Sequence, residues 1–183
     1  ADVVNSSLGY FKFDDESTNH KYREQDGKTT LISRTASMMA GKGMILVNSA
    51  GNAGRSTWKR TNCPADATNI LAVAALSADS VNATFSSVGP SADGRVKPDV
   101  AAQGVQSTVI DGSGVITTAN GTSFASPITC GMVTCLWQAL PHKTAIEIMD
   151  LVRKSADRAD YPDNIYGYGI PDYWKAYEEG KRK

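Results

Sequence analysis

The sequence has no excess of charge of either sign and no long apolar run. Its 19 Lys and Arg residues equal its 19 Asp and Glu residues, so nothing favours the basic surface that nucleic acid or an anionic membrane attracts. No apolar run reaches the roughly 18 residues that span a bilayer, and the N-terminus lacks the charged and apolar regions of a signal peptide. We therefore expect no nucleic-acid partner and no membrane span.

Cysteine is scarce and does not follow the spacing of a metal or redox site. The chain contains Cys63, Cys130 and Cys135, an odd number with no C-x-x-C pair. We interpret them as small buried thiols, and their redox state stays open.

Histidine is scarcer still, and no acidic cluster is typical of a metal site. His20 lies in a polar stretch and His142 follows a proline at an expected helix start, so we expect both to be solvated surface residues. Asp14, Asp15 and Glu16 are interpreted as a solvated loop rather than calcium ligands. We assign no metal ligand and no cofactor to this chain.

The sequence does contain enough apolar material for one core. With 183 residues, 41% of them apolar, the chain is expected to be a single globular domain or a large part of one. It opens on the strand-like pattern "ADVVNSSL" without a polar lead, which suggests a chain cut inside a larger fold.

Hydrophobic patterning predicts an α/β architecture. Short apolar runs predict strands at Val3–Leu8, Met44–Val47 and Asn69–Leu76, and a helical spacing spans Lys28–Lys42. Between the first strand and this helix, the polar stretch Tyr10–Gly27 is expected to be a surface loop. Because the later runs are continuous rather than alternating, they favour a parallel sheet covered on both faces.

The second half of the chain predicts a hairpin followed by helices. Two β-rich stretches flank Asp111–Gly114, a hairpin signal. Phe124–Leu140 is apolar nearly all round, so we expect a helix buried in the middle of the domain. An amphipathic helix is expected at Lys143–Ser155, and Pro171 indicates the start of a last short helix.

Ser123, in "ANGTSFASP" (residues 119–127), stands just before the expected central helix and admits two interpretations. Serine is a favoured helix N-cap. It could equally be a nucleophile, because the free N–H groups and dipole of a helix N-terminus stabilise a developing oxyanion. The small neighbours Gly121 and Ala125 would let a substrate backbone approach closely. The motif alone leaves both readings open.

Two further segments precede Ser123 at expected strand ends. Asn52, in "NSAGNAG" (residues 48–54), follows an inner strand, where open α/β sheets place their binding crevices. Its amide is the kind of donor that an oxyanion hole uses, although an Asn here could also be a turn residue. "NSSLG" (residues 5–9) is a strand end that could accept an extended peptide by strand addition.

Six segments together resemble the C-terminal half of a subtilisin-like serine protease, in the order that this family uses. They are "NSSLG", "NSAGNAG", "ATFSSVGP" (83–90), "KPDVAAQG" (97–104), "NGTSFASP" and "YGYGIPDYWKA". The Gly-Thr-Ser-x-Ala-x-Pro match is the most specific, and the resemblance covers most of the chain outside residues 10–27. It implies that residues 1–183 form the C-terminal portion of a subtilisin-like peptidase catalytic domain, a partial fold that lacks the N-terminal strands.

The resemblance implies a role for each matching residue. Ser123 matches the family nucleophile, which forms an acyl-enzyme during cleavage of a peptide bond, and Asn52 matches the oxyanion-hole asparagine. Two segments match the walls of the pocket for the side chain before the scissile bond: Ser7, Leu8 and Gly9, and Ser49, Ala50 and Gly51. Ile128 and Gln103 depart from the usual His and Pro of the family, but neither position is the catalytic base.

A larger departure is an absence. The family's catalytic Asp and His lie in Asp-Thr/Ser-Gly and His-Gly-Thr motifs upstream of the matching segments, and this chain contains neither motif. A serine without an adjacent base is a weak nucleophile, so we expect the chain to be inactive alone. The resemblance further implies a protein or peptide substrate, a secreted, periplasmic or cell-surface location, and calcium sites largely on segments outside this chain. It also implies that Val3–Leu8 is left as a sheet edge through which the chain could self-associate.

Two alternatives belong to other functional classes. A protease-like module could have lost catalysis and kept its groove for binding peptides, but both Ser123 and Asn52 are retained. An esterase of the α/β-hydrolase type would carry Gly-x-Ser-x-Gly, whereas this chain has Gly-Thr-Ser-Phe-Ala at residues 121–125. The sequence therefore favours the peptidase and leaves its side-chain preference open.

Overall fold

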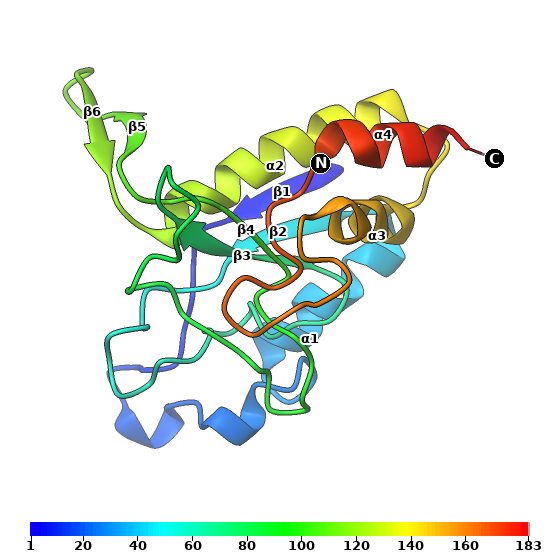
Figure 1. Ribbon diagram of the computed structural model, residues 1–183. Coiled ribbons are helices and arrows are strands. Elements are labelled where there is room, and N and C mark those ends of the chain that lie inside the picture. The colour runs from blue at the N-terminus through cyan, green and yellow to red at the C-terminus, as the bar shows by residue number, and fades with distance from the viewer. Residues whose placement is uncertain (183) are drawn as a thin grey trace.

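A parallel β-sheet forms the centre of the computed structural model, which describes residues 1–182 (Figure 1). Its four strands follow the order β1-β2-β3-β4, and each neighbouring pair is parallel. The strands are β1 (Val3–Ser6), β2 (Ile45–Ser49), β3 (Leu71–Leu76) and β4 (Val100–Gln103). The expected parallel sheet is therefore confirmed, although β4, inside the "KPDVAAQG" segment, was not predicted as a strand.

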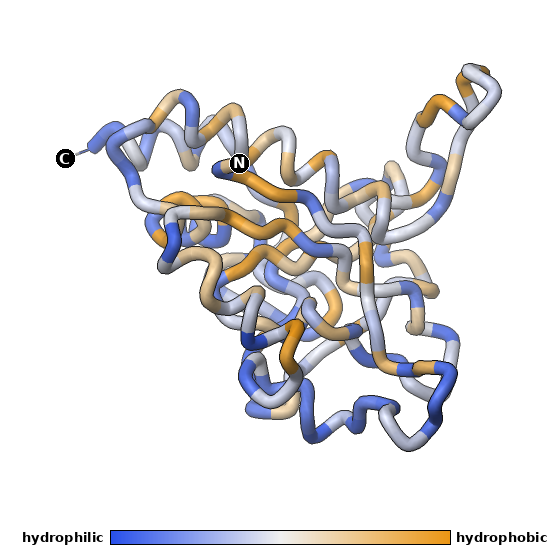
Figure 2. The backbone as a smooth tube through the Cα atoms, turned by 180° about the vertical axis from the view of Figure 1, so that it is seen from behind, coloured by the Kyte–Doolittle hydropathy of each residue, from blue (hydrophilic) through white to orange (hydrophobic). Residues whose placement is uncertain are grey.

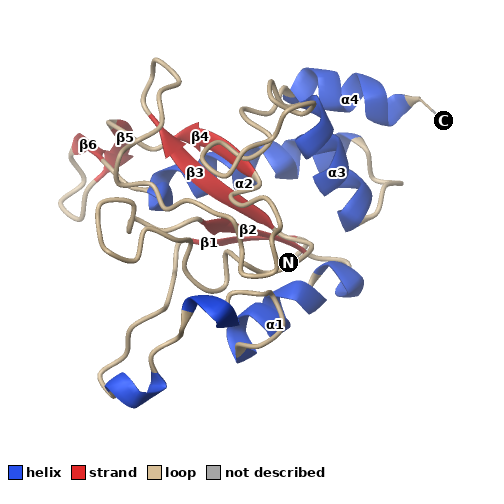
Figure 3. Cartoon of the chain, turned by 60° about the horizontal axis from the view of Figure 1, so that its bottom comes forward, coloured by secondary structure: helices blue, strands red, loops and turns tan. Residues whose placement is uncertain are grey.

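Helices cover both faces of this sheet, as expected. On one face lie α2 (Thr122–Ala139), α3 (Ala145–Ser155) and α4 (Tyr173–Lys181), and α1 (Leu31–Met38) lies on the other (Figure 3). Three short 3₁₀ turns complete the helical elements: η1 (Glu16–Thr18), η2 (Tyr22–Glu24) and η3 (Ala40–Lys42). The helix expected over Lys28–Lys42 thus divides into α1 and η3, and α4 begins two residues after Pro171.

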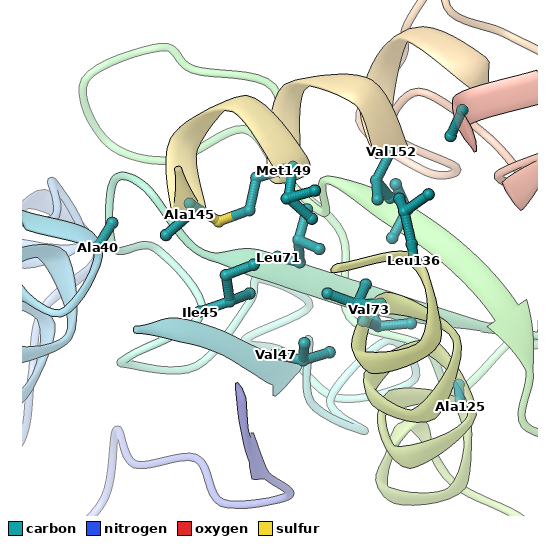
Figure 4. Close-up of a cluster of buried hydrophobic side chains, with 14 of the residues drawn as sticks. Ala40, Ile45, Val47, Leu71, Val73, Ala125, Leu136, Ala145, Met149 and Val152 are labelled. Carbon is teal, nitrogen blue, oxygen red and sulfur yellow. The ribbon is translucent and has the colours of Figure 1, made fainter. Parts of the chain in front are cut away.

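The main core lies between the sheet and helices α2 and α3 (Figure 4). Val47 of β2 and Leu71 and Val73 of β3 are completely buried there against Leu136 of α2 and Met149 of α3. Neighbouring strand residues point to the opposite face, since side chains alternate along a strand. Every residue of β2 and β3 is buried, which explains their continuous apolar runs.

The second face of the sheet is closed by α1 and a loop. Leu46 and Ala72 pack there against Ala36 of α1 and against Ala65 and Ala67. Thr30 caps α1, because its side chain accepts a hydrogen bond from the N–H of Ser33. In Figure 2 the hydrophobic segments gather in the central strands, whereas the loop over residues 10–27, at the bottom, is mostly hydrophilic.

Helix α2 is not buried all round, contrary to expectation. Ala125, Val133 and Leu136 face the core, but Ile128 and Met132 are 46% and 41% exposed. The sheet covers only one side of a helix, and although α3 and α4 also contact α2, they leave Ile128 and Met132 partly exposed. Apolar composition predicted burial in general, but it could not say which residues a neighbour covers.

The hairpin and the loop largely follow the sequence predictions. Strands β5 (Ser107–Ile110) and β6 (Ile116–Ala119) pair antiparallel and project from the body of the fold (Figure 1). Residues 10–27 form the expected loop, interrupted by η1 and η2. Gln25 is the exception, since it is completely buried and its side-chain amide donates to the carbonyl of Thr61.

The cysteines are not uniformly buried. Cys63 is completely buried, Cys130 is half-buried and Cys135 is exposed, and all three are free thiols. Burial, reinforced by the negative charge of Asp66, raises the pKa of Cys63 to about 12. The expectation of buried thiols is right for Cys63 and wrong for Cys135, which lies on the outward side of α2.

A buried ion network ties the segment just before β4 to α3. The carboxylate of Asp99 accepts hydrogen bonds from the Lys97 ammonium at 2.6 Å, from Arg153 at 2.9 Å and from the N–H of Ala72 at 2.9 Å. Arg153 also donates to the carbonyl of Ile70 at 2.8 Å. Burial alone would raise the pKa of Asp99, but the two cations outweigh it and hold that pKa below its ordinary value.

Candidate active site

A cleft lies where β1 and β2 end and α2 begins. Its volume is about 420 Å³, and it is lined by Ser7, Gly9, Phe11, Ser49, Gly51, Asn52, Ala53, Ser56, Asn62, Thr122 and Ser123. Parallel strands place their carboxyl ends at one edge of a sheet, and open α/β folds bind ligands there. The three segments singled out in the sequence therefore meet at one site.

Ser123 lies in the first turn of α2 and is not the helix cap. Gly121 occupies the N-cap position, and α2 begins at Thr122. Ser123 is half-buried, and among residues 1–182 its hydroxyl and backbone N–H have no hydrogen-bond partner. Both groups remain available to a ligand in the cleft, at the positive end of the helix dipole.

Asn52 is held so that one end of its amide stays free. Its Oδ1 accepts hydrogen bonds from the N–H and the hydroxyl of Thr122, each at 2.9 Å, and that hydroxyl accepts one from the N–H of Gly51 at 3.2 Å. A backbone N–H can only donate, which fixes the oxygen of the Asn52 amide toward Thr122. The Nδ2 group is left as a donor beside the N-terminus of α2.

A chain of hydrogen bonds joins the end of β1 to the same turn of α2. Ser126 donates to Oδ1 of Asn5 at 2.7 Å, Nδ2 of Asn5 donates to the Ser7 hydroxyl at 3.2 Å, and this hydroxyl donates to the carbonyl of Ser123 at 3.0 Å. Asn5 and Ser126 lie within the segments "NSSLG" and "NGTSFASP", but the sequence indicated no role for either. Both position the first turn of α2 relative to β1.

The two expected wall segments lie side by side. Asn48, completely buried, donates from Nδ2 to the carbonyl of Leu8 at 3.3 Å and to that of Ser49 at 2.7 Å, so it links both segments. The Leu8 side chain is 58% exposed, and neither Leu8 nor Ala50 lines the cleft. The other four wall residues, Ser7, Gly9, Ser49 and Gly51, do line it.

Neither histidine reaches this cleft. His142 is exposed, as expected. His20 is only partly exposed, because its ring packs edge-on against Phe13 at 5.0 Å and its Nδ1 lies 3.9 Å from the Glu24 carboxylate. The description of His20 as a freely solvated residue is therefore wrong, and within residues 1–182 no imidazole lines the cleft beside Ser123.

Metal-binding clusters and membrane-spanning helices are both absent from the described residues. Residues 1–182 contain no group of three or more His, Cys, Asp or Glu side chains arranged to hold a metal ion. Asp15 instead accepts a hydrogen bond from the N–H of Ser17 and caps η1. Over the same residues no helix has the length and apolar character needed to cross a bilayer.

Known proteins are similar to this chain in sequence. The chain is 28% identical to serine protease AprX of Bacillus subtilis over 92% of its own length and 41% of that protein. It is also 28% identical to subtilisin DY of Bacillus licheniformis, over 92% of this chain and 53% of that one. The chain therefore spans about half or less of these relatives.

Solved structures agree on the fold. The self-cleaved protease domain of PatA superimposes with a TM-score of 0.75 at 22% identity, covering 99% of this chain and 62% of that one. The prenylagaramide maturation protease PagA gives a TM-score of 0.75 at 20% identity, with 99% and 62% covered. The sequence profile of the subtilase family matches residues 1–169, and the chain therefore belongs to the subtilase family.

Proposed function

We propose that this chain is the nucleophile-bearing part of a serine endopeptidase that cleaves peptide bonds through an acyl-enzyme on Ser123. The observation that carries the proposal is the free hydroxyl of Ser123 in the same cleft as the anchored amide of Asn52. Membership of the subtilase family supports serine peptidase chemistry. A protein or peptide is the corresponding substrate, and a secreted, periplasmic or cell-surface location follows from the family resemblance.

Groups in the cleft supply the nucleophile and the oxyanion donors of the proposed mechanism. The Ser123 oxygen attacks the scissile carbonyl, its proton passes to a base, and the oxyanion accepts hydrogen bonds from the Ser123 N–H and the Asn52 Nδ2. The intermediate collapses when the same proton passes to the leaving amine, and water then hydrolyses the acyl-enzyme. The two wall segments hold the substrate chain next to Ser123.

Within residues 1–182 no imidazole lines the cleft to act as the base for the first step. The sequence contains neither an Asp-Thr/Ser-Gly nor a His-Gly-Thr motif, so we assign the base to a segment that this sequence does not contain. Serine proteases that lose a triad member keep roughly 10³–10⁴-fold catalysis over water, a small part of their total. We expect the chain alone to be inactive in ordinary peptidase assays.

Labelling with a fluorophosphonate probe tests the proposal, since the probe reacts with an activated serine. A longer form of the protein that supplies the base should be labelled at Ser123 and should cleave a denatured protein. Ser123→Ala should abolish both results, whereas Ser113→Ala, at an exposed serine in the hairpin turn, should leave them unchanged. If the gene upstream encodes neither missing motif, the endopeptidase proposal is wrong.

A catalytically silent peptide-binding module is the second candidate. The cleft without an imidazole beside Ser123 favours it, whereas the free hydroxyl and the anchored Asn52 amide favour the enzyme. Absence of labelling in a longer form that still binds peptides would select the binding module.

A further inference from the structure

Asn62 occupies the space between the two walls of the cleft. An added Cβ on Gly9 would lie 2.8 Å from the Cβ of Asn62, and one on Gly51 would lie 2.9 Å from its Nδ2. Each wall therefore has a glycine at the point of closest approach to Asn62, where any larger side chain would clash with it. Because Asn62 also lines the cleft, its amide forms the floor between the walls.

Backbone hydrogen bonds hold this floor in place from both sides. The N–H of Asn62 donates to the carbonyl of Ala50 at 3.1 Å, within one wall. The next residue, Cys63, exchanges two hydrogen bonds with Tyr10, directly after the other wall, at 2.8 and 3.2 Å. The Asn62 amide is thus supported by the backbone of both wall segments rather than by a mobile loop.

The amide of Asn62 has unused hydrogen-bonding capacity. Its Oδ1 is buried and has no partner among residues 1–182, and no protein group accepts from its Nδ2 there. Because Oδ1 is closed off from the cleft, a ligand reaches the amide through Nδ2. Polar groups in native structures nearly always have partners, so a ligand acceptor would complete this floor.

The lining also excludes some side chains. None of the eleven residues around the cleft carries a charge, so a charged side chain would lose its hydration without gaining a counter-ion. An apolar side chain would leave the Asn62 amide unpaired, which a site built for hydrogen bonding rejects. A neutral side chain that ends in a strong acceptor, such as the carboxamide of Gln or Asn, fits both conditions.

From this geometry we infer that Asn62 selects a carboxamide side chain, that of Gln or Asn, at the substrate residue before the scissile bond. The inference rests on the proposed function, because it takes the cleft to be the pocket for that residue. In the complex the oxygen of the substrate carboxamide accepts a hydrogen bond from Nδ2 of Asn62.

Binding of short peptides tests the inference without requiring hydrolysis. Four tetrapeptide acids, Ala-Ala-Ala-Xaa with Xaa as Gln, norleucine, Glu or Lys, are titrated into the chain and followed by NMR. We expect the Gln peptide to bind about tenfold more tightly than the norleucine peptide, because norleucine leaves the Nδ2 donor of Asn62 without an acceptor. The two charged peptides should bind more weakly than the Gln peptide.

Variants then assign the preference to Asn62. Asn62→Ala should remove the preference for Gln, and Asn62→Asp should move it to the Lys peptide. Asn19→Asp, which adds the same charge and keeps the acceptor that binds the N–H of Phe13, should leave the ranking as it is. The dispersion of each NMR spectrum shows whether the variant is folded.

Two results would overturn the inference: equal affinity for all four peptides, or no measurable binding of any of them by the unmodified chain. The peptide ranking in the unmodified chain decides the matter even if a variant fails to fold. Probe labelling at Ser123 tests the endopeptidase proposal, whereas the peptide titration tests the role of Asn62. A failure of one can therefore be told apart from a failure of the other.

Discussion

Replacing Asp99 with asparagine should destabilise the fold far more than the same change at Asp150. Both carboxylates contact the Arg153 guanidinium, Asp99 at 2.9 Å and Asp150 at 3.2 Å. Asp99 also pairs with Lys97 at 2.6 Å, and its side chain is 7% exposed, against 49% for Asp150. The two substitutions therefore remove equal charge from one network at very different depths.

The expected loss of stability depends on whether the remaining cation is buried or exposed. Without the Asp99 carboxylate, the buried ammonium of Lys97 has no counter-ion, and removal of one partner from a buried ion pair typically costs about 3–5 kcal/mol. An exposed pair such as that of Asp150 contributes about 0–1 kcal/mol. Since whole domains are stable by about 5–15 kcal/mol, Asp99→Asn should remove a large part of the folding free energy.

Urea unfolding followed by circular dichroism measures the difference. With a slope of about 2 kcal/mol per molar urea, Asp99→Asn should lower the midpoint by about 2 M and Asp150→Asn by less than about 0.5 M. Equal shifts for the two variants would refute the argument that burial sets the value of these charges.

Acid adds an independent check on the same carboxylate. The pKa of Asp99 in the folded chain is lowered, so its contribution is complete above the unfolded pKa of about 4 and is lost as the pH falls through the folded pKa. Below about pH 4 the unmodified chain should therefore lose stability more steeply than Asp99→Asn. Parallel pH profiles for the two proteins would contradict this assignment.

Three further predictions concern the site, the sheet edge and the thiols. In a form that supplies the base, Asn52→Ala should lower kcat by about 10²–10³ with Ser123 still present, because it removes one oxyanion donor; an unchanged kcat would exclude this role. The isolated chain should self-associate through the Val3–Leu8 edge, and light scattering that finds only monomer at high concentration would contradict this. Iodoacetamide at pH 8 should modify exposed Cys135 and spare Cys63 until urea unfolds the chain, because burial holds the Cys63 pKa near 12; equal rates in the native state would contradict the burial of Cys63.

Local patterns predicted the elements that local physics determines. The apolar runs that became β2 and β3 are buried along their whole length, so their sequence indicates their environment directly. The helix predicted over Lys143–Ser155 begins at Ala145, where Thr144 and Glu147 form a capping box. The family motifs predicted that Ser123 and Asn52 belong to one site, and in the structure both residues line the same cleft.

Features that depend on distant partners had no such signal. Arg153 lies 54 residues from Asp99 along the chain, and nothing near either residue indicates their pairing. Asn62 follows a polar stretch typical of any loop, and its position between the two walls results from backbone hydrogen bonds to residues far away in the sequence. The outward apolar face of α2 was assigned to the core for the same reason, since composition does not specify which neighbours are present.

The first wall of the cleft is built on an edge strand of the sheet. β1 pairs on one side only, with β2, within the described residues, and its end carries Asn5 and Ser7, which hold the first turn of α2. Edge strands with few partners open more readily than central ones. Loss of β1 would release the carbonyl of Ser123 and remove one wall at the same time, while β2 would keep Asn52 in place. Pairing of the free edge of β1, by whatever segment covers it, therefore stabilises the cleft as well as the sheet.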